Sequence, residues 1–190
     1  MLATLSRALE ARDPYLHGHA ERVTAVAEAV ALRLGWSGER LVTLRLGGRL
    51  HDIGKVAVPA SVLRKPAPLD EREREQIRLH PRFGARLVER VEAARPALPY
   101  VLYHHERWDG AGYPTGKAGA AIPIEARVLA VADAFDAMTS PRPYRDALPT
   151  EHALAEVEAC AGSQFDPDVA EVFLDVWARR PDIWPAALAG

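Results

Sequence analysis

The sequence has almost no cysteine: Cys160 is the only one in 190 residues, so an intrachain disulfide is excluded and a reducing compartment is favoured. No hydrophobic run reaches the ~18 residues that a membrane span needs. The longest candidate, from Val23 to Leu34, is interrupted by Glu28 and Arg33. The first residues, 1–10, lack the charged start and long apolar block of a secretion signal. We therefore expect neither a membrane-spanning, nor a fibrous, nor a disulfide-rich secreted protein.

An excess of charge of one sign is also lacking. The chain has 24 Lys and Arg against 26 Asp and Glu, which gives a formal net charge of −2. This balance gives no reason to expect binding to a nucleic-acid polymer, although a local basic pocket for a small phosphate ligand stays open. With 48% hydrophobic and 26% charged residues, the composition is globular, and we expect a single domain over 1–190.

Signals for β-strands are nearly absent, and the dominant hydrophobic period is helical. We predict an all-α helical bundle, in which Ser37 and Thr150 are N-caps and Asp70 forms a capping box with Glu73. The predicted helices cover residues 19–34, 37–51, 70–79, 83–91, 99–106, 123–135, 150–161 and 166–177. Three segments without periodicity are predicted to be functional loops gathered on one side of the bundle. They are 54–69, 107–121 and 140–149.

Residues of metal-ligand type fall on separate predicted helices or their ends. They are His19, His51, Asp52, His80, His104, His105 and Asp133. A single His-Asp pair is weak evidence, and two adjacent histidines on a helix point about 100° apart. Asp133, however, lies in an apolar helix with no Lys or Arg within one turn, and an unpaired buried carboxylate is costly. The combination therefore predicts a two-metal site in the bundle core, and only His17 and His152 are left as scattered surface histidines.

Two strings in the sequence carry a family resemblance. Residues 50–55 read LHDIGK, and residues 104–114 read HHERWDGAGYP, which is longer and more specific. Together they resemble the HD-GYP domain, a branch of the HD-superfamily metal-dependent phosphohydrolases, and shorter matches extend the resemblance over residues 9–174. It implies an all-α HD-domain bundle in the bacterial cytoplasm. Its implied activity is hydrolysis of the messenger cyclic di-GMP to pGpG or GMP.

The resemblance also implies a ligand set. It assigns His19, His51, Asp52 and Asp133 to one metal ion, and Asp52, His80, His104 and His105 to a second, so that Asp52 bridges. Lys55 resembles the family's lysine beside the reacting phosphate, and Arg142 and Arg145 resemble cations that hold the ligand's phosphates. Members with a third metal have a glutamate at the position of Tyr15, so we expect two ions. Iron or manganese is expected, with zinc, cobalt or nickel as alternatives.

In the mechanism that the resemblance implies, a metal-bound hydroxide attacks the phosphorus, while Lys55 neutralises the developing charge. Gly112, Tyr113 and Pro114 are expected to contact the substrate. Tyr113 and Trp108 are candidates to stack on guanine, although an aromatic residue in a loop more often packs against its neighbours. The same loop is expected to bind diguanylate cyclases of the GGDEF type. A homodimer, a dinucleotide sensor with little turnover, and a phosphohydrolase for another nucleotide stay open.

Overall fold

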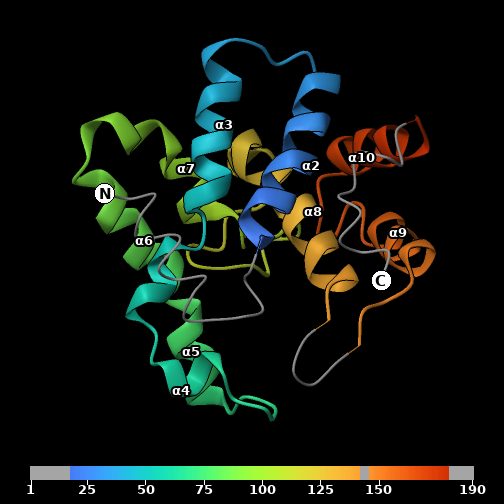
Figure 1. The fold of residues 1–190 in the computed structure, drawn as a ribbon. Helices are drawn as coiled ribbons and strands as arrows, with labels where there is room; N and C mark the ends of the chain where they lie inside the picture. Colours follow the sequence, from blue (N-terminus) through green and yellow to red (C-terminus); the bar gives the residue numbers. More distant parts are fainter. Residues whose placement is uncertain (1–17, 142–145, 180–190) are drawn as a thin grey trace.

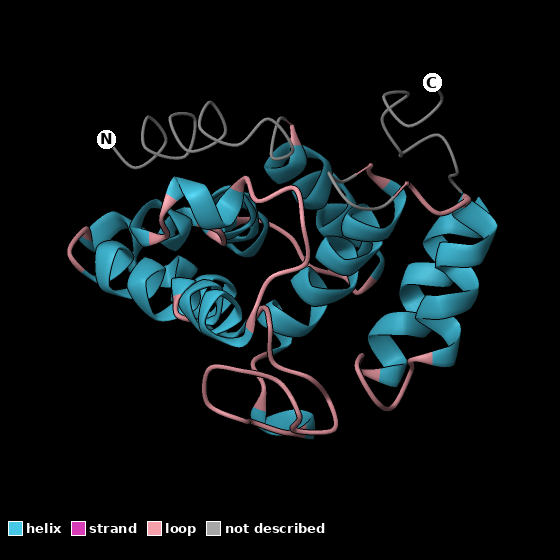
Figure 2. Ribbon diagram, turned by 90° about the horizontal axis from the view of Figure 1, so that it is seen from below, coloured by secondary structure: helices cyan, strands magenta, loops and turns pink. Residues whose placement is uncertain are grey.

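The computed structural model describes residues 18–141 and 146–179, and within these ranges the chain is helical and has no β-strand (Figures 1 and 2). The predicted all-α bundle is therefore confirmed. The α-helices are α2 (His19–Arg33), α3 (Glu39–Leu50), α4 (Ala60–Leu63), α5 (Glu71–Arg78), α6 (His80–Glu89), α7 (Leu98–Tyr103), α8 (Ile124–Thr139), α9 (Thr150–Ala159) and α10 (Pro167–Arg179). The short 3-10 helices are η2 (Ile53–Ala57), η3 (Glu92–Ala97) and η4 (Gly119–Ala121). Within the described ranges, no helix is long and apolar enough to cross a membrane.

Helix α8 holds the main hydrophobic core together, because it packs against α2, α7, α9 and α10 (Figure 1). Its Val128, Leu129 and Phe135 side chains are fully buried, and the Phe135 ring lies 5.2 Å from the ring of Phe173 on α10. Burial of each such side chain stabilises the fold by about 1.5–3 kcal/mol. This packing determines which face of α8, including Asp133, is left to line a pocket.

A smaller hydrophobic cluster positions the end of α3 against α6 and α7. It consists of Leu50, Ile53, Val88, Ala94 and Val101. Gly54 follows directly, and a Cβ atom there would collide with the carbonyl oxygen of His80 and the backbone nitrogen of Gly84. Only glycine allows this close approach of η2 to α6, which brings the His51-Asp52 pair next to His80.

Two predicted helix caps are wrong. The N-cap of α3 is Gly38 rather than Ser37, and Thr150 is the first residue of α9, after Pro149 as the N-cap. An N-cap residue must leave the helical backbone conformation, and Gly38 (φ 53°, ψ −132°) and Pro149 (φ −53°, ψ 140°) make that turn themselves. Neither helix start has a side-chain cap hydrogen bond.

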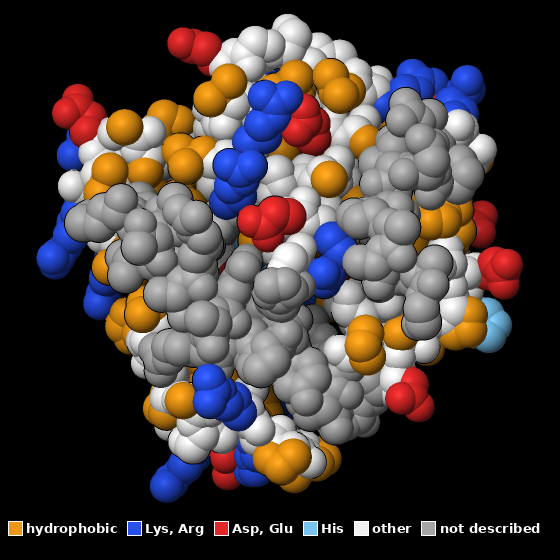
Figure 3. Space-filling view, in the orientation of Figure 1, with side chains coloured by type: hydrophobic (Ala, Val, Ile, Leu, Met, Phe, Trp, Pro, Cys, Tyr) orange, Lys and Arg blue, Asp and Glu red, His pale blue; other side chains and the backbone are white. Residues whose placement is uncertain are grey.

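The predicted capping box is confirmed: the Glu73 N–H donates to Asp70 Oδ1 at 2.9 Å, and the Asp70 N–H donates to Glu73 Oε2 at 2.8 Å. The segment 54–69, predicted to be irregular, contains η2 and α4. Over the face shown in Figure 3, basic and acidic side chains of the described residues are interspersed, in keeping with the small net charge.

Candidate metal centre

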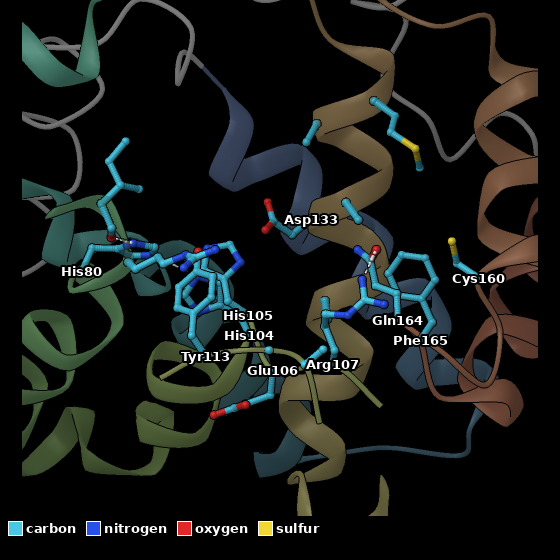
Figure 4. A pocket seen from close by; sticks show the side chains of 18 of the residues that line it. His80, His104, His105, Glu106, Arg107, Tyr113, Asp133, Cys160, Gln164 and Phe165 are labelled. Carbon is cyan, nitrogen blue, oxygen red and sulfur yellow. Dashed lines mark hydrogen bonds between the residues drawn. The ribbon is translucent and has the colours of Figure 1, made fainter. Parts of the chain in front are cut away.

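The predicted ligands share one kind of position, because six of them stand at helix ends and the seventh lies within α8. They are His19 at the start of α2, His51 and Asp52 after α3, His80 at the start of α6, His104 and His105 after α7, and Asp133 on α8. Figure 4 shows that the side chains of His80, His104, His105 and Asp133 face a common space. The structure thus brings all seven together from distant parts of the sequence.

Hydrogen bonds to the backbone orient the histidine rings. The Nδ1 atoms of His51, His80 and His104 lie 2.7, 2.7 and 3.0 Å from carbonyl oxygens three or four residues earlier in the chain. A carbonyl oxygen can only accept, so each Nδ1 carries the proton. The Nε2 atom of each ring therefore presents its lone pair to the centre, as a metal ligand does.

Asp52 lies between two groups of ligand atoms. Its Oδ1 is 3.2 Å from His80 Nε2 and 3.9 Å from His104 Nε2, whereas its Oδ2 is 3.4 Å from His51 Nε2 and 3.8 Å from His19 Nε2. Within each group, the ligand atoms all lie within 4.8 Å of one another. The groups are Asp52, His80, His104 and His105, and His19, His51 and Asp133. One carboxylate oxygen faces each group, which is the geometry that a bridging ligand needs.

Unsatisfied polar atoms show that these residues fit a metal ion. Within the described ranges, the buried His51 Nε2 and Asp52 Oδ1 atoms have no hydrogen-bond partner. The Nε2 atoms of His80 and His104 are 3.2 Å apart, so two lone pairs face each other. A cation between them would remove this repulsion, and imidazole nitrogens with carboxylate oxygens are ligands that divalent transition metals prefer.

The electrostatics of the centre favour ligand-competent protonation states. Burial lowers the pKa of His104 far below its usual range and that of His105 to about 3, so both rings are neutral. Burial also opposes the ionisation of Asp52, but Lys55 and His51 hold its pKa well below the usual range. For Asp133, burial is outweighed by the hydrogen bond with His19 and by the neighbouring histidines, and its pKa is likewise well below the usual range.

The pKa of His19 shifts in the opposite direction to those of His104 and His105. Burial alone would lower its pKa, but hydrogen bonds with Asp133 and Asp136 raise it to about 9. The carboxylates thus stabilise a positive charge at this point, and a metal ion supplies one when it displaces the proton.

Asp136 also belongs to the site, although the sequence motifs did not predict it. Its Oδ2 accepts a hydrogen bond from His19 Nδ1 at 2.7 Å, and its Oδ1 accepts one from Arg22 Nε at 2.6 Å. Its side chain is almost fully buried, and it lies three residues after Asp133 on the same face of α8. In the sequence, the signal for Asp136 is that it and Asp133 are the only charged residues in the apolar stretch 128–138, three positions apart. Such a carboxylate orients a ligand histidine and raises its basicity.

Lys55 stands on η2 and extends into the pocket. Its Nζ is 2.6 Å from Asp52 Oδ2, so the ammonium group lies beside the central carboxylate. The predicted phosphate-binding residues Arg142 and Arg145, and Tyr15, lie outside the described residues.

The loop after α7 has a compact backbone with defined contacts. A Cβ atom at Gly112 would collide with the backbone nitrogen of Arg107, so this position requires glycine. The Tyr113 ring stacks on the His105 imidazole, with centroids 4.8 Å apart and the planes inclined by 29°. The Pro114 carbonyl oxygen accepts a hydrogen bond from Arg82 at 2.8 Å. Gly112 and Tyr113 line the pocket, whereas Pro114 is not part of its lining.

A pocket of about 640 Å³ opens over the centre. This volume falls in the range of about 300–1,000 Å³ that is typical of small-molecule sites. His19, His80, His104, His105 and Asp133 contribute to its wall. The pocket also includes Arg78 at the end of α5, which is exposed, lies 5.7 Å from the Tyr113 ring centroid and was not singled out from the sequence. Trp108 is not in the lining and packs beside Arg127 instead.

Comparison with known proteins identifies the family. A family model described as HD domain matches residues 3–169. The chain is an HD-domain protein. The family assignment made from the HD and HHERWDGAGYP strings is therefore confirmed at the level of the HD family.

This HD-domain protein is 43% identical over 175 residues to the cyclic di-GMP phosphodiesterase response regulator RpfG of Xanthomonas campestris. It is 38% identical over 186 residues to a cyclic di-GMP phosphodiesterase of Thermotoga maritima. The alignments cover 91% and 97% of the chain but 46% and 50% of the relatives, so the chain spans about half the length of the curated relatives it matches.

Among solved structures, a cyclic GMP-AMP specific phosphodiesterase of Vibrio cholerae (V-cGAP3) matches with a TM-score of 0.72 and 22% identity. The match covers 100% of the chain and 50% of the phosphodiesterase. At this level of identity it shows that the fold of the HD-domain protein is shared.

Proposed function

We propose that this HD-domain protein uses two divalent metal ions to hydrolyse a phosphodiester bond of a cyclic dinucleotide. Its proposed substrate is cyclic di-GMP. The observation that carries the proposal is the position of Asp52, which presents one oxygen to each of two ligand groups beneath a pocket of about 640 Å³. The names of the relatives, which are phosphodiesterases of cyclic dinucleotides, support the choice of substrate class.

The seven ligand side chains would hold the two ions, with Asp52 shared between them. When bound, divalent ions supply Lewis acidity and lower the pKa of water, which is what phosphodiester hydrolysis at neutral pH requires. Iron or manganese is the expected metal. The protein contributes imidazole rings already oriented by hydrogen bonds to the backbone, so little reorganisation is needed on binding.

The remaining side chains of the pocket would hold the substrate. The Lys55 ammonium group is placed to neutralise charge on the oxygens of the reacting phosphate. Arg78 on the rim, together with Arg142 and Arg145, would attract the second phosphate. Gly112 and Tyr113 would form the wall beside His105. GGDEF-type partners, a homodimer and a cytoplasmic location stay predictions.

The test is to purify the protein anaerobically, load it with Mn²⁺ or Fe²⁺ and incubate it with cyclic di-GMP. We expect pGpG or GMP to form, with two metal ions per chain by elemental analysis. Tight binding without product would indicate a sensor, and product from other nucleotides alone would refute the choice of substrate.

A further inference from the structure

The pocket continues well past the metal ligands. Its floor beyond Asp133 is a face of α8 with the small residues Ala134 and Ala137. In Figure 4 the histidines lie on one side of Asp133, while a second set of lining residues lies on the other side. Figure 4 labels Cys160, Gln164 and Phe165 on that side. With them we group two further lining residues, Met138 on α8 and Glu156, whose Oε1 lies 3.5 Å from Cys160 Sγ, and we call these five residues the distal end.

The distal end is suited to a flat, uncharged group rather than to a phosphate. Among the described residues, Arg107 of the pocket lining donates to Gln164 Oε1 at 2.9 Å and to Asp109 Oδ2 at 2.6 Å, so its charge is already compensated. The Glu156 carboxylate would repel a phosphate group. Met138 and Phe165 offer apolar contact, which favours an aromatic base.

Glu156 has unused hydrogen-bonding capacity. Its side chain is exposed at the pocket, and among the described residues its carboxylate accepts one weak hydrogen bond, from Cys160 Sγ at 3.5 Å. A carboxylate can accept two parallel hydrogen bonds. Guanine offers two adjacent donors, N1–H and the N2 amino group, on its Watson–Crick edge. Adenine offers one donor and, next to it, the N1 lone pair, which a carboxylate oxygen repels.

We propose that the distal end binds one base of the dinucleotide and that Glu156 selects guanine over adenine there. The inference rests on the proposed function for the class of ligand, because one phosphate at the metal centre leaves a base to occupy the rest of the pocket. It assigns a specificity-determining residue that lies on α9, away from every metal ligand.

The first test is the Glu156→Gln variant, in which the amide can pair with adenine but accepts only one of the two guanine hydrogen bonds. Equal amounts of cyclic di-GMP and cyclic di-AMP compete in one Mn²⁺-containing reaction, and the products give the ratio of the two kcat/KM values. We expect this ratio to fall about tenfold or more in Glu156→Gln. The matched control is Glu158→Gln, which removes the same charge from an exposed position of α9 outside the pocket lining and should keep the ratio.

The second test uses Cys160, the only thiol of the chain, as a reporter within the distal end. Its alkylation by N-ethylmaleimide is followed by mass spectrometry with and without saturating cyclic di-GMP. We expect the dinucleotide to slow alkylation about tenfold in the wild type, and cyclic di-AMP to slow it less.

The outcomes separate this inference from the proposed function. Hydrolysis of cyclic di-GMP with an unchanged ratio in Glu156→Gln, or with no protection of Cys160, would overturn the inference and leave the function standing. Absence of hydrolysis in the wild type would overturn the function. Protection of Cys160 by cyclic di-GMP, but not by cyclic di-AMP, would then support the inference by itself, and equal alkylation rates would overturn it.

Discussion

Replacing Asp52 with alanine should remove most of the stabilisation of this protein by metal. Each Asp52 oxygen faces one ligand group, so the substitution removes a ligand from both positions at once. An ion present at 100 times its dissociation constant stabilises the folded state by about 2.7 kcal/mol, and two ions by about 5 kcal/mol. A change of 1 kcal/mol shifts Tm by about 2–4 °C in a chain of this size, so Mn²⁺ should raise the wild-type Tm by about 10–20 °C.

The assay is differential scanning fluorimetry of metal-stripped protein titrated with Mn²⁺, together with elemental analysis after dialysis. For Asp52→Ala we expect less than about a third of the wild-type Tm shift, and fewer than one ion per chain in place of two. The control is Asp168→Ala, which removes an exposed carboxylate at the start of α10. This variant should keep the full Tm shift and two ions per chain. An Asp52→Ala protein that retains two ions and the full shift would refute the bridging geometry.

Three further predictions concern residues around the centre. Asp136→Asn should weaken Mn²⁺ binding about 10- to 100-fold in calorimetry, because the carboxylate that orients His19 is lost, and an unchanged affinity would argue against that role. Arg78→Gln should raise KM for cyclic di-GMP about fivefold with little change in kcat, whereas Arg72→Gln, the same change of charge on the same helix outside the pocket, should not; equal effects would show that only overall charge matters. Gly112→Ala should lower stability by about 1–3 kcal/mol in urea unfolding, because its Cβ meets the backbone in a tight loop, and a neutral effect would contradict the close approach.

Much of the fold could be predicted because its signals are local. The helical spacing of apolar residues in α2 and α8 can be recognised within about 15 consecutive residues. The capping box of Asp70 and Glu73 spans four residues. The caps of α3 and α9 could not be predicted in the same way. Gly38 and Pro149 make those turns with their own backbones, so the neighbouring Ser37 and Thr150 hydroxyls are not needed.

The need of Asp133 for a positively charged partner could also be argued from sequence, since a carboxylate in an apolar helix must be compensated. The local pattern did not identify its partner, and only the family resemblance implied that His19 and Asp133 share a metal ion. His19 Nε2 lies 3.3 Å from Asp133 Oδ1 although the two residues are more than a hundred positions apart, and only the packing of α2 on α8 brings them together. The hydrogen bond of Asp136 to His19 depends on the same packing, although the spacing of Asp136 from Asp133 is visible in the sequence.

By itself, the sequence determined that the chain is helical and which residue types carry metal-binding chemistry, because helical period and ligand chemistry belong to individual residues and their near neighbours. The tertiary structure alone decided that one Asp52 oxygen faces each ligand group, that the imidazoles turn their Nε2 atoms inward, and that Arg78 and Glu156 share a pocket with them. All of these features are positions and orientations of side chains in three dimensions. They are set by how helices distant in sequence pack against one another, and no local pattern encodes that packing.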